Sequence, residues 1–152
     1  MAAELSHEQE RKLAVDLFNI VWTLLETPER TPEQDDELIN ATHASCHHWS
    51  KVGTTANIAR GEWQISRVYS VLDRAEPALY HAGRCLAYCE SSPDELEDWD
   101  LPFAYEALAR AHAVAGNRED SERFAALAHE LGERIEDEKD RELLTRDLAT
   151  LP

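Results

Sequence analysis

Apolar residues recur every three or four positions along most of the chain, which is the spacing of helices that bury one face. Residues 6–26 illustrate it, with apolar side chains at Leu13, Leu17, Phe18, Val21, Leu24 and Leu25. Ser6 followed by Gln9 fits a capping box, and Thr27-Pro28 ends the segment. The pattern predicts a helix over 6–26 whose apolar stripe packs on the rest of the protein.

The second predicted helix spans residues 32–52 and begins with a cap followed by proline at Thr31-Pro32. Its expected buried stripe is Leu38, Thr42, Ser45 or Cys46, and Trp49. Five more helices are predicted at about 55–72, 77–90, 101–115, 118–135 and 137–149. No alternating β-branched run is long enough for a strand, and the short connections favour antiparallel neighbours. We therefore expect one all-α domain over residues 1–152, with about seven helices and no sheet.

Two stretches of the chain match each other at a constant offset of 43 residues. Ile65-Ser66, Tyr69, Leu72, Ala78, Ala82 and Cys85-Leu86 correspond to Leu108-Ala109, His112, Ala115, Ser121, Ala125 and Ala128-His129. In each stretch a large residue, a small residue and a ring come first, and a turn then leads to a helix with small side chains. Small side chains let one helix lie close against its partner, so each stretch is predicted to be a helix pair.

This pattern resembles the tetratricopeptide repeat (TPR). Asp73 stands where that family usually has a turn glycine, His112 replaces the aromatic residue, and the spacer SSPDELEDWD makes the period longer than the usual 34 residues. The resemblance implies antiparallel helix pairs stacked in a short right-handed superhelix. The repeat units would be residues 55–90 and 101–135, preceded by a degenerate pair at 6–52 and followed by a capping helix at 137–149.

A stack of this kind has a concave binding surface. By the resemblance, its groove would be lined by Arg60, Trp63 and Arg67 from the first unit and by Phe103, Glu106 and Arg110 from the second. Arg60, Trp63 and Arg67 share one helix face on any interpretation, because they lie three and four residues apart. Guanidinium groups bind carboxylate or phosphate in a fork and stack on aromatic rings. The competing interpretation pairs the arginines with Glu62 or with acids on neighbouring helices and buries Trp63.

Histidines and cysteines offer a second candidate site. His43 and His47 lie four residues apart on one predicted helix, and His81 and Cys85 on another. Both helices are second members of pairs, so the stack would place them side by side, and such a mixed ligand set would favour Zn²⁺. The same spacing also arises on any buried helix face, and no metal-ligand or nucleophile motif accompanies it. No catalytic residue is assigned.

The main functional hypothesis is a non-enzymatic binding module, without a cofactor, for a peptide, a protein or an acidic small molecule. One alternative is a metal-binding protein or metal-dependent enzyme that uses the His/Cys residues. Another is a homo-oligomeric scaffold, such as a homodimer, whose groove is filled by a sister chain or by its own C-terminal helix.

Charge and cysteine content bear on the partners and the cellular compartment that we expect for the protein. With 31 acidic residues against 15 lysines and arginines, the formal net charge is −16. Such a charge argues against binding nucleic acid or anionic membranes. No apolar stretch is long enough to span a bilayer, and no leader pattern is seen, so a cytoplasmic location is expected. The three cysteines are expected to be reduced and buried, without a bridge between Cys85 and Cys89, which lie one helical turn apart.

Overall fold

The structure is a computed structural model that describes residues 3–152. These residues form seven α-helices and one short 3₁₀ helix, and no strand is found among them. The helices are α1 (His7–Leu25), α2 (Pro32–Val52), α3 (Thr55–Val71), α4 (Ala75–Ser91), η1 (Pro93–Glu95), α5 (Asp100–Val114), α6 (Arg118–Gly132) and α7 (Glu138–Ala149). The all-α prediction is confirmed.

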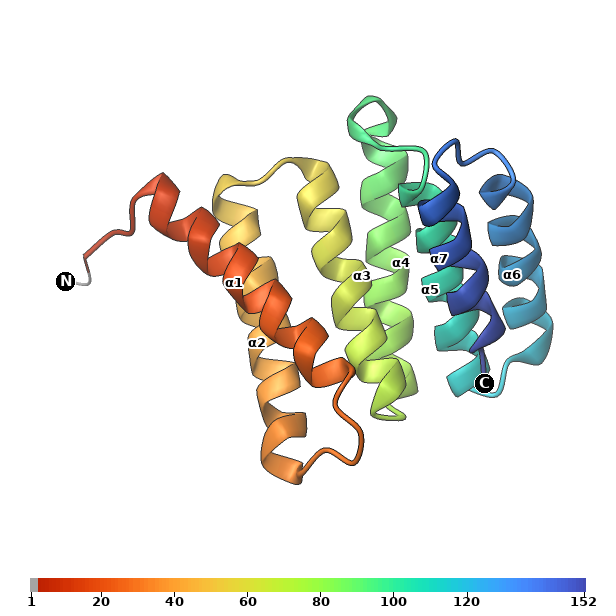
Figure 1. Cartoon of the computed structure of the whole chain (residues 1–152), viewed down its shortest axis with the longest axis horizontal. Coiled ribbons are helices and arrows are strands. Elements are labelled where there is room, and N and C mark those ends of the chain that lie inside the picture. Colours follow the sequence, from red (N-terminus) through yellow and green to blue (C-terminus); the bar gives the residue numbers. More distant parts are fainter. Residues whose placement is uncertain (1–2) are drawn as a thin grey trace.

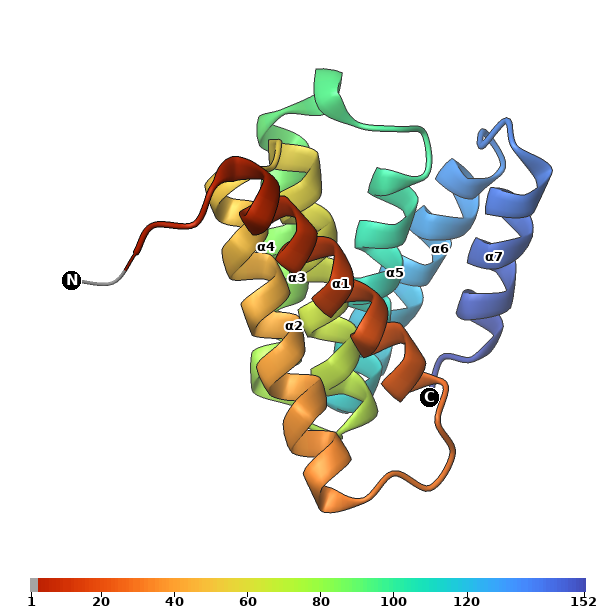
Figure 2. The same cartoon turned by 60° about the vertical axis from the view of Figure 1, so that its left-hand side comes forward.

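Consecutive helices pack as antiparallel pairs, and the pairs follow one another along the molecule (Figure 1). The pairs are α1 with α2, α3 with α4, and α5 with α6, while α2 packs on α3 and α4 packs on α5. Helix α7 packs against α5 and α6 and closes the C-terminal end. Figure 2, in which the opposite end is turned forward, shows α1 and α2 in front of α3, and α2 packs on α3. The predicted stacking of two pairs between residues 55 and 135 is confirmed, and the handedness of the superhelix stays a prediction.

The helix starts follow the capping signals of the sequence. The side chains of Ser6 and Thr31 each accept a hydrogen bond from the backbone N–H three residues later. In turn, the backbone N–H groups of Ser6 and Thr31 donate to the side chains of Gln9 and Gln34. Thr54 forms the same box with Asn57. These reciprocal bonds satisfy N–H groups that have no partner within the helix, and they fix three of the seven starts.

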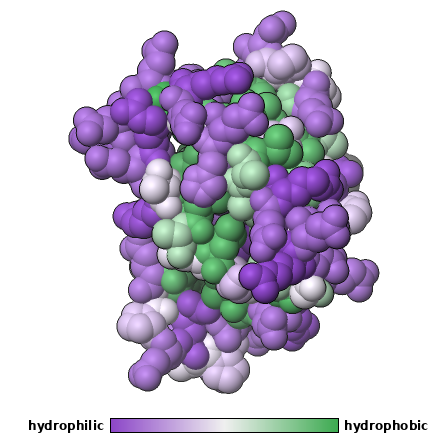
Figure 3. Space-filling model, turned by 90° about the vertical axis from the view of Figure 1, so that its right-hand side faces the viewer, coloured by the Kyte–Doolittle hydropathy of each residue, from purple (hydrophilic) through white to green (hydrophobic). Residues whose placement is uncertain are grey.

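Two helix bounds differ from the prediction by more than one residue. Helix α4 begins at Ala75 rather than at residue 77, because Pro77 lies in the first turn, where its missing N–H would have no helical partner. Helix α6 ends at Gly132 rather than at 135, because the chain turns there and buries Ile135 against α7. A Cβ atom at Gly132 would lie 2.5 Å from a terminal methyl carbon of Leu144, so glycine leaves room for that side chain between α6 and α7. Figure 3 faces this side and shows apolar surface in a band between hydrophilic groups.

The turns inside the two repeat units have the same geometry. Asp73 and Gly116, which are 43 residues apart, have backbone φ angles of 57° and 80°. In each turn the next residue donates its backbone N–H to a carbonyl five residues back, at 2.8 Å and 2.9 Å. This bond satisfies a carbonyl at the helix end and requires a left-handed residue beside it. Aspartate tolerates that conformation better than most residues, which explains how Asp73 replaces glycine.

One buried serine bridges each of the three helix pairs. Its hydroxyl donates to a backbone carbonyl of the partner helix, from Ser45 to Ala14 at 2.7 Å, from Ser66 to Ala78 at 2.8 Å and from Ser121 to Ala109 at 2.8 Å. The last two bonds are reciprocal, because position 66 corresponds to 109 and position 78 to 121 in the internal match. The same crossing is therefore bridged in opposite directions in the two units, which supports the helix-pair repeat.

Candidate functional site

One cleft of about 310 Å³ is lined by residues of α1, α3, α4, α5 and α7. Aromatic rings form most of its walls: Phe18, Trp22, Trp63, Trp99 and Phe103. Its charged lining residues are Arg60, Asp100, Asp140, Arg146 and Asp147. Five helices thus contribute to one apolar cavity with polar groups among its lining residues, which is the usual composition of a ligand site.

The rings touch one another across helix boundaries. Trp22 of α1 and Trp63 of α3 have centroids 5.5 Å apart, and Phe103 of α5 meets Trp63 edge-on at 5.9 Å. Trp99, just before α5, contacts Phe103 at 6.4 Å. Edge-on and tilted contacts of this kind stabilise the aromatic wall beyond the area that it buries.

Arg60 lies in the cleft but is already paired. Its Nε and Nη2 donate to the two carboxylate oxygens of Asp100 at 2.9 Å and 2.8 Å, and its guanidinium lies 4.5 Å from the ring centre of Trp99. The hydrogen bonds with Asp100 raise the pKa of Arg60 above its ordinary value. Asp100 also accepts the N–H of Glu97 at 2.8 Å, so the pair fixes the start of α5.

Arg67 belongs to a buried ion network behind the cleft. Its Nη2 donates to Glu106 at 3.2 Å and to Asp147 of α7 at 3.1 Å, and its guanidinium lies 5.2 Å from the Trp63 ring. Arg110 donates its Nε to the same Glu106 oxygen at 2.8 Å and an Nη2 hydrogen to the backbone carbonyl of Asp147 at 2.8 Å. Only 13% of the Arg67 side chain and none of the Glu106 side chain is exposed.

The structure therefore places the six predicted groove residues in two groups. Arg60, Trp63 and Phe103 line the cleft, whereas Arg67, Glu106 and Arg110 bind α7 to the stack. Both arginines that were expected to contact an anionic ligand, Arg60 and Arg67, are paired with carboxylates of neighbouring helices. That pairing is the alternative that the sequence left open.

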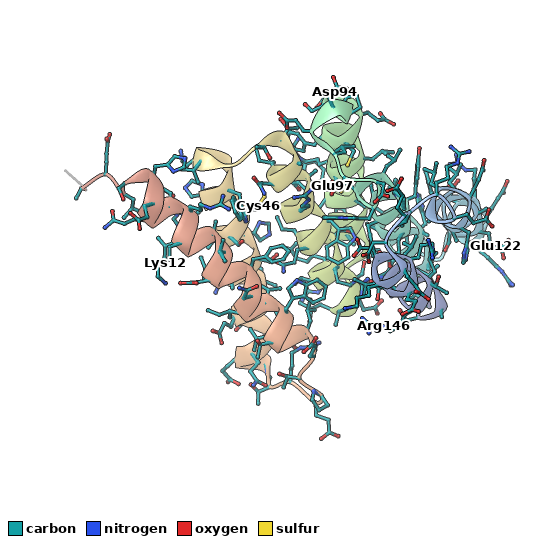
Figure 4. The ribbon with its side chains drawn as sticks, turned by 45° about the horizontal axis from the view of Figure 1, so that its top comes forward. Lys12, Cys46, Asp94, Glu97, Glu122 and Arg146 are labelled. Carbon is teal, nitrogen blue, oxygen red and sulfur yellow. The ribbon has the colours of Figure 1, made fainter. Side chains whose placement is uncertain are left out.

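The sequence analysis did not predict Arg146, a basic residue of the cleft that has no carboxylate partner in the part of the chain that the structure describes. Arg146 lies on α7 (Figure 4) and lines the cleft. It is exposed, and it forms no ion pair with any residue between 3 and 152. Asp140, Leu143 and Asp147 line the cleft from the same helix. Their spacing of three and four residues was a readable signal that one face of α7 points to a common surface.

Cys85 and Cys89 also line the cleft, one turn apart on α4, and both thiols are free and buried. The hydrogen bond with Cys89 and burial raise the pKa of the Cys85 thiol well above its ordinary value. Cys46 (Figure 4) is buried and free as well, and it lies against Gly61 of α3. Burial raises the pKa of its thiol to about 12. The expectation of three buried, unbridged cysteines is confirmed.

Two of the histidines, His43 and His81, lie in a polar cluster between α2, α3 and α4. The rings of His43 and His81 lie 5.4 Å apart. The Nε2 of His43 is 2.8 Å from the Tyr69 hydroxyl, and the Nδ1 of His81 is 2.5 Å from a carboxylate oxygen of Glu62. Burial lowers the pKa of His43, which favours its neutral form.

The four candidate metal ligands do not converge. His43 and His81 meet, but His47 is exposed and contacts His48, and Cys85 lies in the cleft. Across residues 3–152, no three His, Cys, Asp or Glu side chains are close enough together to hold one metal ion. No helix in the same part of the chain is long and apolar enough to cross a membrane.

These features define an all-α protein of stacked helix pairs with one aromatic cleft. Comparisons add no relative to this description: no protein family, no curated protein and no solved structure matches the chain.

Proposed function

We propose that this protein is a TPR-like binding module whose cleft takes an aromatic or apolar group of a peptide, a protein or a small acidic molecule. The observation that carries the proposal is the set of five rings contributed by α1, α3, α5 and the segment before α5 around one open cavity. A solvent-accessible wall of rings costs free energy unless a ligand covers it, since apolar area gains about 25 cal/mol per Å² on burial.

The anionic part of the ligand would contact Arg146. This arginine is the basic lining residue whose guanidinium no carboxylate between residues 3 and 152 occupies. Arg60 would serve a different purpose, because its fork with Asp100 holds Trp99 against the cleft. The chemistry thus fits a ligand with a flat apolar body and one carboxylate.

The test uses 2-naphthylacetate and its neutral amide as probes, titrated into ¹⁵N-labelled protein. We expect saturable shifts that include the indole N–H signals of Trp22, Trp63 and Trp99. Arg146→Gln should weaken binding of the acetate by about fivefold, since an exposed charge contact is worth about 1 kcal/mol, and leave binding of the amide unchanged. Arg118→Gln removes an equal charge from an arginine that is exposed on α6, so it is the matched control. Shifts scattered over the surface, or equal effects of the two variants, would refute the proposal.

A further inference from the structure

The first helix pair carries an open groove on a surface that shares no residue with the cleft. The groove has a volume of about 500 Å³, and its floor is formed by Leu17 and Ile20 of α1 with Ala41 and Ala44 of α2. Helices α1 and α2 end the stack on this side, as Figure 2 shows, and the substantial helix contacts of this pair are with each other and with α3.

The α1 side of the groove is an apolar stripe that no other helix covers. Leu17 and Ile20 line the groove, and Leu13, one turn before Leu17, extends the same helix face beyond the lining residues. Leu13 and Ile20 are 38% and 40% exposed. Two of the six large hydrophobic side chains exposed between residues 3 and 152 are therefore in this stripe. Leu13 and Ile20 are seven residues apart, or about 10 Å at 1.5 Å per residue, which corresponds to two turns of a docked helix.

The α2 side of the groove is acidic. Glu33, Asp36 and Glu37 line it at a spacing of three and four residues, all are exposed, and none forms an ion pair with a residue between 3 and 152. Neighbouring Asp35 differs, because it binds Arg30 at 2.8 Å. No lysine or arginine between residues 3 and 152 lines the groove. The groove thus joins an apolar floor to three uncompensated negative charges.

We propose that this groove docks a basic amphipathic helix of another protein. A helix that lays leucine-like side chains on the floor and lysines or arginines along the α2 rim satisfies both features at once. A second copy of this chain fits less well, because the formal charge of −16 and the acids on the groove itself would bring like charges together. This interaction is separate from the proposed cleft function and does not rest on it.

The probe is a 14-residue peptide built from two copies of LKKLLKL, which places leucines on one helix face and lysines on the other. A scrambled isomer of equal charge has no apolar face. The protein variant Glu33→Gln/Asp36→Asn/Glu37→Gln removes the acidic rim. Its control, Glu119→Gln/Glu130→Gln/Glu136→Gln, removes the same charge from exposed positions at the other end of the stack. A further variant, Ile20→Ser, removes apolar area from the floor.

By calorimetry at 150 mM salt, we expect the amphipathic peptide to bind at least tenfold more tightly than its isomer. The rim variant and Ile20→Ser should each weaken binding about tenfold, and the control by less than twofold. Equal weakening by the two charge variants, or equal binding of the two peptides, would show general attraction to an acidic protein and overturn the proposal. A dimer in sedimentation that Ile20→Ser converts to monomer would assign the groove to a second copy and overturn it as well.

Discussion

Replacing Arg67 with alanine tests whether the network behind the cleft holds the fold together. The change removes the contacts of Nη2 with Glu106 at 3.2 Å and with Asp147 at 3.1 Å, and also the packing over Trp63. It thereby removes the ion pair between Arg67 and Asp147, which joins α3 to α7. It also leaves Glu106, whose side chain is completely buried, with Arg110 as its remaining partner.

The expected cost follows from this burial. Removing one partner of a buried ion pair typically costs about 3–5 kcal/mol, because the other charge stays in a poorly solvated place. Arg110 still contacts Glu106 at 2.8 Å, so we expect the free energy of unfolding to fall by about 2–3 kcal/mol, near or below the low end of that range. For a domain of this length, 1 kcal/mol corresponds to about 2–4 °C, so Tm should fall by about 4–12 °C.

Urea unfolding and calorimetric melting of Arg67→Ala measure this directly. The matched control is Arg118→Ala, since Arg118 also binds a glutamate but its side chain is 90% exposed, and the expected change there is about 0.5 kcal/mol or less. Asp147→Asn, alone and combined with Arg67→Ala, completes a double-mutant cycle whose coupling energy we expect to be about 1 kcal/mol or more. If Arg67→Ala and Arg118→Ala lower Tm equally, the network does not stabilise the fold and the reasoning is wrong.

Three further predictions concern other parts of the molecule. Burial lowers the pKa of His43 in the folded state, so the unfolded chain binds a proton at His43 more readily than the folded chain does. The contribution of neutral His43 to stability is therefore lost as pH falls below about 6.5. The free energy of unfolding should depend less on pH between 7.5 and 5.5 in His43→Gln than in the control His47→Gln. A thiol reagent should label the three cysteines of the native protein slowly and those of the denatured protein at once, whereas fast labelling of native protein would contradict their burial. Gly116→Ala should lower the free energy of unfolding by about 1 kcal/mol or more, because the φ angle of Gly116 is 80°. Gly83 lies inside α4 with open space around its Cβ position, so Gly83→Ala should raise the free energy of unfolding by about 0.5–1 kcal/mol. Urea unfolding should give opposite signs for the two variants.

The helices could be predicted from the sequence because their signals are local. The capping boxes at Ser6 and Thr31 and the apolar spacing of three and four residues lie within single helices. The end of α6 could not, because it depends on Ile135 and Leu144 meeting across a turn. A close approach of two helices leaves no local mark in the sequence beyond the glycine that permits it.

Only the α3 wall of the cleft could be predicted from the sequence. Helical spacing places Arg60 and Trp63 on one face of α3, and the structure shows both in the cleft. The partners of the arginines were not predictable, since Arg60 binds Asp100 from 40 residues away and Arg67 binds Asp147 from 80 residues away. With 31 acidic residues in the chain, periodicity gives no means to choose between them.

The repeat and the cleft depend on different residues of the same helices. The matched positions, such as Ser66, Ala78 and their counterparts Ala109 and Ser121, lie where the helices of a pair cross, and they keep that crossing the same in both units. The cleft residues differ between the helices that line it, since α1 contributes Trp22, α3 contributes Trp63 and α7 contributes Arg146. The repeat therefore accounts for the shared face, while residues that, apart from Cys85, lie outside the internal match decide what that face can bind. Substitutions of cleft residues should consequently change binding more readily than they change the stack, and α7, bound through Asp147, contributes to both.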